Sequence, residues 1–191
     1  MSPVQFFIKY SWPLLALVIF IGSTVLLDRF NPKNAIIERL GKVYFSTDKT
    51  PCYSPQALFD MLDKYSDEDR RAHVRFIYLD LVYPVIYSVT VAIVLASLLS
   101  ALLPASQSWL RYLALLPFLI AIFDCLENLS LLWIVQRYSA SYRPFGLARF
   151  SSAMTTTKLF LMCVTAALIS VALVALVVRM LRSSLPAATR P

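Results

Sequence analysis

Long apolar stretches separated by polar segments dominate the hydrophobic pattern of this chain. A bilayer core about 30 Å thick requires roughly 20 mostly apolar residues from each helix that crosses it. Four stretches meet this requirement, at about residues 10–27, 76–103, 109–135 and 152–181. Within the last of them, Leu159 to Val178 contains no charged residue. We therefore predict an all-α polytopic membrane protein, built as a bundle of four transmembrane helices.

The same pattern predicts the domain organisation. Residues 1–182 are expected to form a single membrane domain, in which the loop 28–75 makes a small helical extramembrane cap. Residues 183–191 are rich in Ser, Ala and Pro and are expected to form a disordered tail. No small-x-small cleavage site closes the first apolar stretch, and the charged pair Asp28-Arg29 follows it directly. We therefore expect an uncleaved first helix rather than a signal peptide.

The loop 28–75 contains three signals for the start of a helix. A capping residue followed by proline, or a serine followed three residues later by an acid, is typical of a helix N-terminus. The three signals are Asn31-Pro32, Ser54-Pro55 and Ser66-Asp67-Glu68-Asp69. We expect the first helix to stop at Gly41 and the third to continue unbroken into the second span. The two short helices can lie in the headgroup plane, pack over the nearby ends of the bundle, or do both.

Composition and charge further limit the class of protein and the kinds of partner and site that we expect. With 59% hydrophobic and 15% charged residues, the chain is far from both disordered and ordinary soluble proteins. The net charge of +7 comes from basic residues that flank the spans, so we do not expect nucleic acid as a partner. The three cysteines are far apart and there is one histidine, which argues against a zinc site and a disulfide framework. We expect no metal and no cofactor.

The distribution of basic residues also predicts an orientation. Four spans place both termini and residues 104–108 on one side, and the loops 28–75 and 136–151 on the other. Most Lys and Arg residues lie in these two loops, so the positive-inside rule predicts that both are cytoplasmic. Arg179 and Arg182, on the opposite side, oppose this orientation. The expected location is the cell membrane, or the inner membrane if the protein is bacterial.

Two of the predicted spans carry a narrow polar stripe. Side chains three, four or seven residues apart lie on one face of a helix. The second span has Asp80, Tyr83, Pro84 and Tyr87 at such spacings, and the third has Asp124, Glu127 and Asn128. With a rise of about 1.5 Å per residue, both stripes lie in the half of the bilayer nearer the two long loops. The fourth span begins with polar residues at the same level, Lys158 among them.

These polar residues form a candidate site. A charged group inside a span costs about 2.5–3.5 kcal/mol on the insertion scale and therefore needs a reason. The candidate ligand-binding residues are Asp80, Tyr83, Tyr87, Asp124, Glu127, Asn128 and Lys158. Asp124 and Glu127, one helical turn apart, are the candidates for a catalytic pair that shares a proton and acts as acid and base.

Several of these residues have a plainer interpretation. Asp80 lies near the membrane surface, where it can snorkel or pair with Arg71, Arg75 or an arginine of the loops. Lys158 directly precedes the uncharged run, so its side chain is expected to snorkel to the surface unless the acids hold it. The tyrosines can be ordinary aromatic packing, and Asn128 can join two helices by hydrogen bonds.

A set of short motifs in the middle of the chain is similar to motifs of a known group of proteins. Between about residues 53 and 130 the chain contains Tyr53-Ser54-Pro55, Arg70-Arg71, Leu79-Asp80 with Pro84 and Tyr87, and Phe123-Asp124 with Glu127-Asn128. In this order they resemble a group of uncharacterised four-helix integral membrane proteins. The resemblance implies the four-helix architecture and, because that group has no established activity, it implies no chemistry.

Three functions fit this pattern, and we rank them in this order. The first is a pocket that binds, with or without acting on, a lipid-like or small polar-headed molecule. The second is an accessory or assembly protein whose acids pair helices or bind a partner membrane protein; the spacing of Ala166 and Ser170 suits a close helix contact. The third is a proton- or cation-coupled carrier. Membrane lipid is an expected partner in all three. No HExxH, GxSxG or CxxC motif is present, and whether the protein is an enzyme stays open.

Overall fold

The computed structural model describes residues 3–41, 44 and 46–184, with side chains at all of these except 3–14, 48, 105, 183 and 184. Throughout this part the chain is helical and has no β-strand. Three helical stretches in it are long and apolar enough to cross a membrane: Asp67–Leu102, Ser106–Arg137 and Phe145–Arg182. A fourth candidate joins Leu15–Arg29 to Asn34–Leu40 across a bend of 48°. The all-helical class is confirmed, with three to four helices able to span a membrane.

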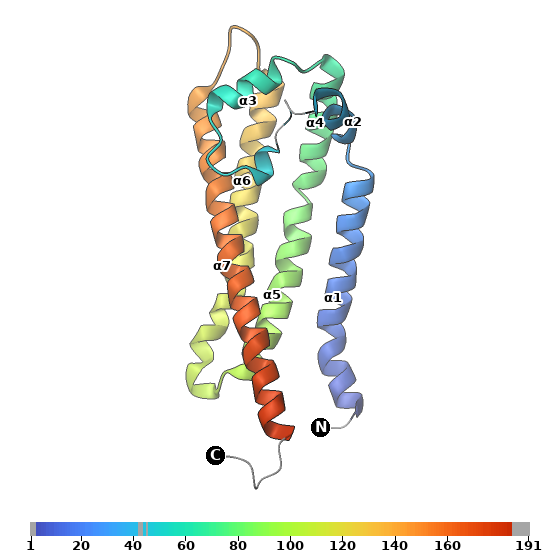
Figure 1. Cartoon of the computed structure of the whole chain (residues 1–191), viewed down its shortest axis with the longest axis vertical. Helices are drawn as coiled ribbons and strands as arrows, with labels where there is room; N and C mark the ends of the chain where they lie inside the picture. The colour runs from blue at the N-terminus through green and yellow to red at the C-terminus, as the bar shows by residue number, and fades with distance from the viewer. Residues whose placement is uncertain (1–2, 42–43, 45, 185–191) are drawn as a thin grey trace.

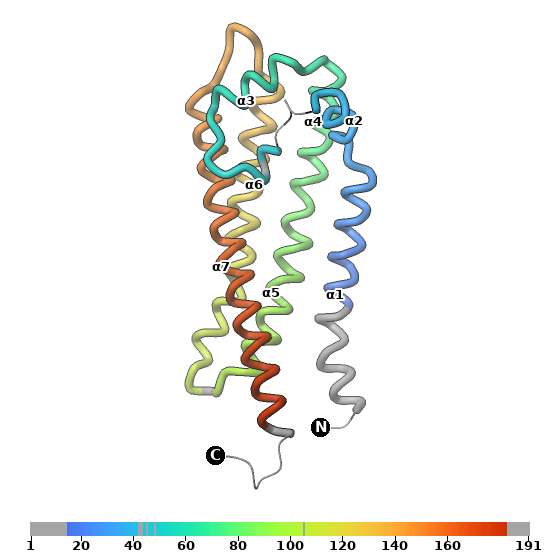
Figure 2. Tube along the Cα trace, viewed as in Figure 1, coloured from blue at the N-terminus to red at the C-terminus, as the bar shows by residue number. Residues whose placement is uncertain are grey.

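Long helices run alongside one another over most of the length of the molecule (Figure 1). They are α1 (Pro3–Arg29), α5 (Tyr83–Leu102), α6 (Leu116–Arg137) and α7 (Phe145–Ser184). Helix α5 contacts α1, α6 and α7, and the contact between α6 and α7 is the most extensive. The start of α1, the end of α7 and the 3-10 helix η3 (Ala105–Leu115) share one end. Figure 2 shows the connections from α1 to α4 and from α6 to α7 at the opposite end, as the order of the spans predicts.

The end that carries the longer connections is covered by a small cap. The cap consists of α2 (Asn34–Leu40), η2 (Thr47–Lys49), α3 (Pro55–Leu62) and the beginning of α4 (Asp67–Asp80). Helix α3 starts as predicted, because the Ser54 side chain accepts a hydrogen bond from the Ala57 backbone N–H. Its apolar face, at most 1% exposed, consists of Leu58, Phe59, Met61 and Leu62.

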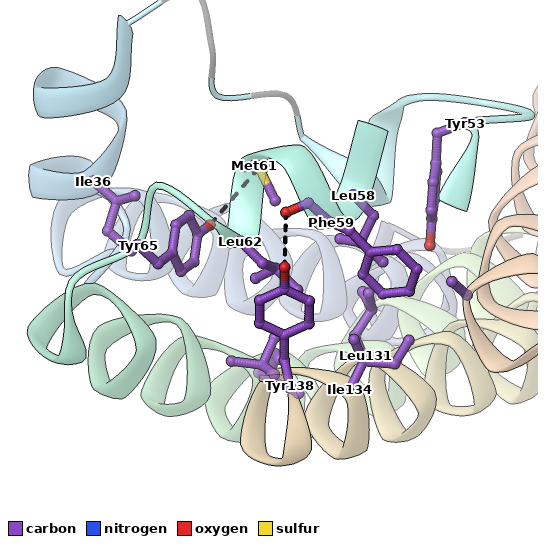
Figure 3. Close-up of a cluster of buried hydrophobic side chains, with 13 residues drawn as sticks. Ile36, Tyr53, Leu58, Phe59, Met61, Leu62, Tyr65, Leu131, Ile134 and Tyr138 are labelled. Carbon is purple, nitrogen blue, oxygen red and sulfur yellow. Dashed lines mark hydrogen bonds between the residues drawn. The ribbon is translucent and has the colours of Figure 1, made fainter. Parts of the chain in front are cut away.

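This apolar face decides where α3 lies. It packs against Leu131 and Ile134 of α6 and against the first turn of α7, in one buried cluster (Figure 3). Burying a side chain of this size stabilises a protein by roughly 1.5–3 kcal/mol. The predicted packing of α3 over the ends of the long helices is therefore confirmed.

Polar contacts hold the cap in place. The Tyr138 hydroxyl, just after α6, donates to the carboxylate of Asp63 and lies 3.4 Å from the carbonyl oxygen of Phe59 (Figure 3). The Asp63 carboxylate also pairs with the Arg143 guanidinium at 2.9 Å. Burial, together with the hydrogen bond to the Asp63 carboxylate and its negative charge, raises the pKa of Tyr138 to about 12. The phenol therefore remains a hydrogen-bond donor at any ordinary pH.

The other helix-end signals of the cap act as predicted, with one exception. Ser66 and Asp69 form a reciprocal capping box at the start of α4. Gly41 ends α2 with a φ of +52°, a conformation that favours glycine. The prediction that Asn31 caps α2 is wrong, because the N-cap position is Lys33. The Asn31 side chain instead accepts a hydrogen bond from the Lys33 backbone N–H, which closes a turn before the helix.

Prolines determine where α5 and α6 begin. As predicted, the helix that starts after Ser66 runs unbroken through His73 into the second span. It is interrupted inside that span, because α4 ends at Asp80 and α5 starts at Tyr83 after a short turn. Pro84, in the first turn of α5, has no N–H to donate to the Asp80 carbonyl four residues earlier. Pro117 similarly lies in the first turn of α6, and the residues before it form η3 instead of the start of the third predicted span.

Helix α7 begins at Phe145, earlier than the predicted start near residue 152. The additional turns pack under the cap: the Phe145 ring meets the Phe59 ring edge to face at a centroid distance of 4.9 Å, and Ala148 is fully buried. At the other end, residues 183 and 184 of the predicted tail still belong to α7, and residues 185–191 lie outside the described residues.

Candidate functional site

A buried lysine joins α6 to α7. The Lys158 side chain of α7 is 5% exposed, and its ammonium lies 3.0 Å from Asp124 Oδ1 and 2.6 Å from Glu127 Oε2. Both acids lie on one face of α6, and Glu127 is completely buried. Removing a charge from water costs several kcal/mol, so such a group is retained only where opposite charges compensate it. The acids therefore hold Lys158 inside the molecule, and its side chain does not snorkel.

Asn128 of α6 supplies the hydrogen bond that Pro84 cannot make. Its Nδ2 lies 3.3 Å from the backbone carbonyl oxygen of Asp80, 3.2 Å from Asp80 Oδ2 and 3.5 Å from Asp124 Oδ1. In hydrocarbon, a backbone carbonyl that loses its helical donor needs another partner. The asparagine side chain on the neighbouring helix meets this need and joins α4 to α6.

Tyrosines extend the network to α5 and α1. The Tyr87 hydroxyl donates to Asp124 Oδ2 at 3.1 Å. The Tyr83 ring contacts the Tyr87 ring at a centroid distance of 5.6 Å, and the Tyr83 hydroxyl hydrogen-bonds to Thr24 Oγ1 of α1 at 2.7 Å. The Phe20 ring of α1 stacks on Tyr83 with the centroids 6.2 Å apart. The seven candidate residues from the sequence therefore form one connected group at one level of the molecule.

A cavity of about 390 Å³ lies beside this group, with walls from all the long helices. Its polar and aromatic end is formed by Asp80, Tyr83, Tyr87, Asp124 and Lys158, and by Phe20 of α1. The remaining wall is mostly apolar and includes Val91, Ile120, Met162 and Ile169. Sites for small molecules commonly have a volume of about 300–1,000 Å³, with a few polar groups in an apolar lining. Size and lining both match that description.

Two of the candidate residues stand behind the cavity wall. Glu127 and Asn128 are not among the residues that line the cavity; they contact Lys158, Asp124 and Asp80, which do. Of the two candidate catalytic acids, Asp124 can therefore meet a bound molecule directly, whereas Glu127 acts on Lys158.

The sequence did not single out several wall residues. Phe20 and Met162 look like lipid-facing side chains in an apolar helix. Lys49, exposed on η2, reaches the edge of the cavity from the cap, and such a long-range approach leaves no local pattern. Thr165 lies seven residues after Lys158, a spacing that places both on one face of α7. That spacing is the signal that could have identified it.

The described residues contain no group of three or more His, Cys, Asp or Glu side chains that could hold a metal ion. The polar groups that the structure brings together at the site are carboxylates, an ammonium, phenols and an amide.

No protein-family model, curated protein or solved structure matches this chain. The resemblance to four-helix membrane proteins stays a prediction, and the function has to be inferred from the geometry of the site.

Proposed function

We propose that this protein is a four-helix membrane protein that binds one lipid-like molecule in the cavity between its helices. The observation that carries the proposal is the division of the cavity into a charged, aromatic end and a mostly apolar remainder. An amphipathic molecule has the same division, so its head can meet Asp124 and Lys158 while its apolar part lies along Val91 and Ile169. We assign it no reaction.

The outward faces of the helices support a membrane setting. Large apolar side chains are more than 50% exposed there, among them Val25, Ile122, Leu129, Val171 and Val174. Apolar surface of this extent is unfavourable in water and favourable in hydrocarbon. Wall residues Met162 and Ala166 are also exposed, so a molecule from the surrounding bilayer can reach the cavity sideways. By the positive-inside rule we place the cap and the loop 136–151 in the cytoplasm, and the protein in the cell or inner membrane.

The charges favour a head that donates hydrogen bonds or carries a positive charge. The Lys158 ammonium is already matched by Asp124 and Glu127, so the cavity needs no further anion. If all three are ionised, the group carries one excess negative charge. The rings of Tyr83 and Tyr87 lie at the same end, and aromatic faces attract cations. A protonated amine is the head that suits carboxylates and aromatic rings together.

A role for the acids in pairing helices is the second candidate, and one observation favours it. Glu127 is directed at Lys158 rather than at the cavity, so its contact serves to join α6 and α7. This role is compatible with ligand binding, because Asp124 contacts both the cavity and Lys158.

Native mass spectrometry of the full chain, released from its membrane in mild detergent, tests the proposal. We compare the wild type with Ala166→Phe, which places a ring in the cavity without changing any charge. Ala167→Phe is the matched control, because Ala167 is exposed on the same helix and does not line the cavity. We expect one retained small-molecule mass on the wild type and on Ala167→Phe, and its loss from Ala166→Phe.

Two results would contradict the proposal. One is a wild-type protein that carries no discrete mass under conditions that preserve its fold. The other is equal retention by Ala166→Phe and Ala167→Phe, which would place the bound molecule on the outer surface.

A further inference from the structure

A threonine hydroxyl in the apolar part of the cavity has no hydrogen-bond partner within the part of the chain that the structure describes. Thr165 of α7 is 4% exposed and lines the cavity. Its Oγ1 is out of contact with solvent and makes no hydrogen bond among the described residues. Buried polar atoms are nearly always hydrogen-bonded, so each exception calls for an explanation.

Thr165 does not make the hydrogen bond within its own helix that such residues usually make. A threonine or serine in an apolar helix commonly donates to the carbonyl four residues earlier. Thr155, Thr156, Thr157 and Ser170 of the same helix all do so, at 2.8 to 3.1 Å. Thr165 does not. Rotation about its Cα–Cβ bond exchanges the hydroxyl and the methyl group without moving the backbone, so the hydroxyl can turn towards a molecule in the cavity.

The position of Thr165 relative to the charged end is defined by the helix. Lys158 and Thr165 are seven residues apart, which places them on one face of α7 and about 10 Å apart along its axis. Met162 lies between them on the same wall. A molecule that has its head at Asp124 therefore passes an apolar stretch before it reaches Thr165.

We propose that Thr165 is a second polar contact for the bound molecule, which carries a hydroxyl or carbonyl group about 10 Å from its head. The inference rests on the proposed function and makes it more specific: the ligand is an amphipathic molecule with two polar groups and an apolar segment between them. Thr165 can donate to a carbonyl, or both donate to and accept from a hydroxyl.

Two probes that differ in one group test this inference. They are octylamine and the aminooctanol that carries a hydroxyl at the far end of the same chain. Binding of each to the purified full chain is measured by calorimetry for the wild type and for Thr165→Val, which has nearly the same shape and no hydroxyl. Because each probe is compared between variants, its partition into detergent cancels. The matched control is Thr157→Val, at a half-buried threonine of the same helix that donates to the Ala153 carbonyl and does not line the cavity.

We expect Thr165→Val to weaken the binding of aminooctanol about fivefold to tenfold and to leave that of octylamine within about twofold. We also expect the ligand-free Thr165→Val protein to melt at a higher temperature than the wild type, because an unpartnered buried hydroxyl is removed. A residue with only a structural role would not weaken the binding of one probe while stabilising the empty protein. Thr157→Val should change neither the relative affinity for the two probes nor the melting temperature of the ligand-free protein in this way.

The failures of the two proposals can be told apart. If octylamine binds the wild type and aminooctanol loses nothing on Thr165→Val, the inference about Thr165 is wrong while the cavity remains a binding site. If neither probe binds the wild type, the proposed amine-binding cavity itself is contradicted. Thr165→Ser, which keeps the hydroxyl, should retain the wild-type preference; a loss of preference in this variant would also overturn the inference.

Discussion

At the scale of single residues, the central feature is an ammonium held between two carboxylates inside an apolar region. Lys158 is in contact with Asp124 and Glu127, and all three are at most 6% exposed. The desolvation of three ionised groups is unfavourable, and their mutual attraction offsets it only while the set is complete. The stability of the protein should therefore depend more on the balance of positive and negative charge in this group than on any one of its residues.

We predict that Lys158→Met destabilises the protein by about 3–5 kcal/mol, because it leaves two buried acids without a cation. Adding Glu127→Gln to this variant should restore part of the loss, since one of the unmatched charges is removed. The free energy of unfolding in detergent, measured by denaturant titration, gives both values. Lys49→Met, at an exposed lysine, is the control and should change stability little. A double variant less stable than Lys158→Met would contradict the charge-balance account.

The sequence singled out these charged residues for a physical reason. An ionisable side chain in an apolar helix is costly, so its presence alone marks a site, as at Asp124. Thr165 and Phe20 carry no such mark. The hydroxyl of a threonine in a membrane helix usually donates a hydrogen bond to a backbone carbonyl of the same helix. A phenylalanine there usually faces lipid or packs in the core. Their part in the cavity depends on which face of α7 and α1 meets the other helices, which requires the three-dimensional arrangement.

At the scale of secondary-structure elements, the break between α4 and α5 connects to the site. Pro84 removes the donor for the Asp80 carbonyl, and Asn128 replaces it from α6. The break between α4 and α5 and an interhelical hydrogen bond therefore have one cause. The sequence placed Pro84 and Asn128 on two polar stripes, but it did not show that one compensates the other.

This compensation predicts a coupling between the two positions. Asn128→Leu should cost on the order of 1 kcal/mol in the wild type, the usual range for hydrogen bonds between membrane helices. In a Pro84→Ala background, residue 84 regains its N–H, and the same substitution should cost measurably less. A double-mutant cycle on the free energy of unfolding measures the difference. Pro117→Ala is the control background, since Pro117 begins α6; an equal cost of Asn128→Leu in all three backgrounds would refute the compensation.

The elements themselves were largely predictable because their lengths and apolar content are sufficient evidence. The positions of the helix ends were less predictable. Ser54 and Ser66 cap helices as their local sequence predicts, whereas Asn31 forms a turn instead. Helix α7 gains its early turns from packing against Phe59 of the cap, a contact between residues far apart in the chain.

At the scale of the whole molecule, a cap, a polar layer and an apolar cavity follow one another along the helices. The cap closes one end with the buried cluster around Phe59 and Ile134. The layer of Asp124, Lys158 and Tyr87 lies further along the helices, and the cavity extends from it past Met162. If the cavity binds an amphipathic molecule as proposed, this order gives that molecule a single direction, with its head towards the cap.

Photolabelling tests this arrangement most directly. An alkylamine with a photoreactive diazirine in its chain is added to membranes that contain the full-length protein, and the labelled residues are identified by peptide mass spectrometry. The account predicts labels on the cavity wall, at Val91, Met162 and Ile169, that excess octylamine removes and that are absent from Ala166→Phe. Labels confined to outward residues such as Val171 and Val174, and unaffected by octylamine, would contradict it.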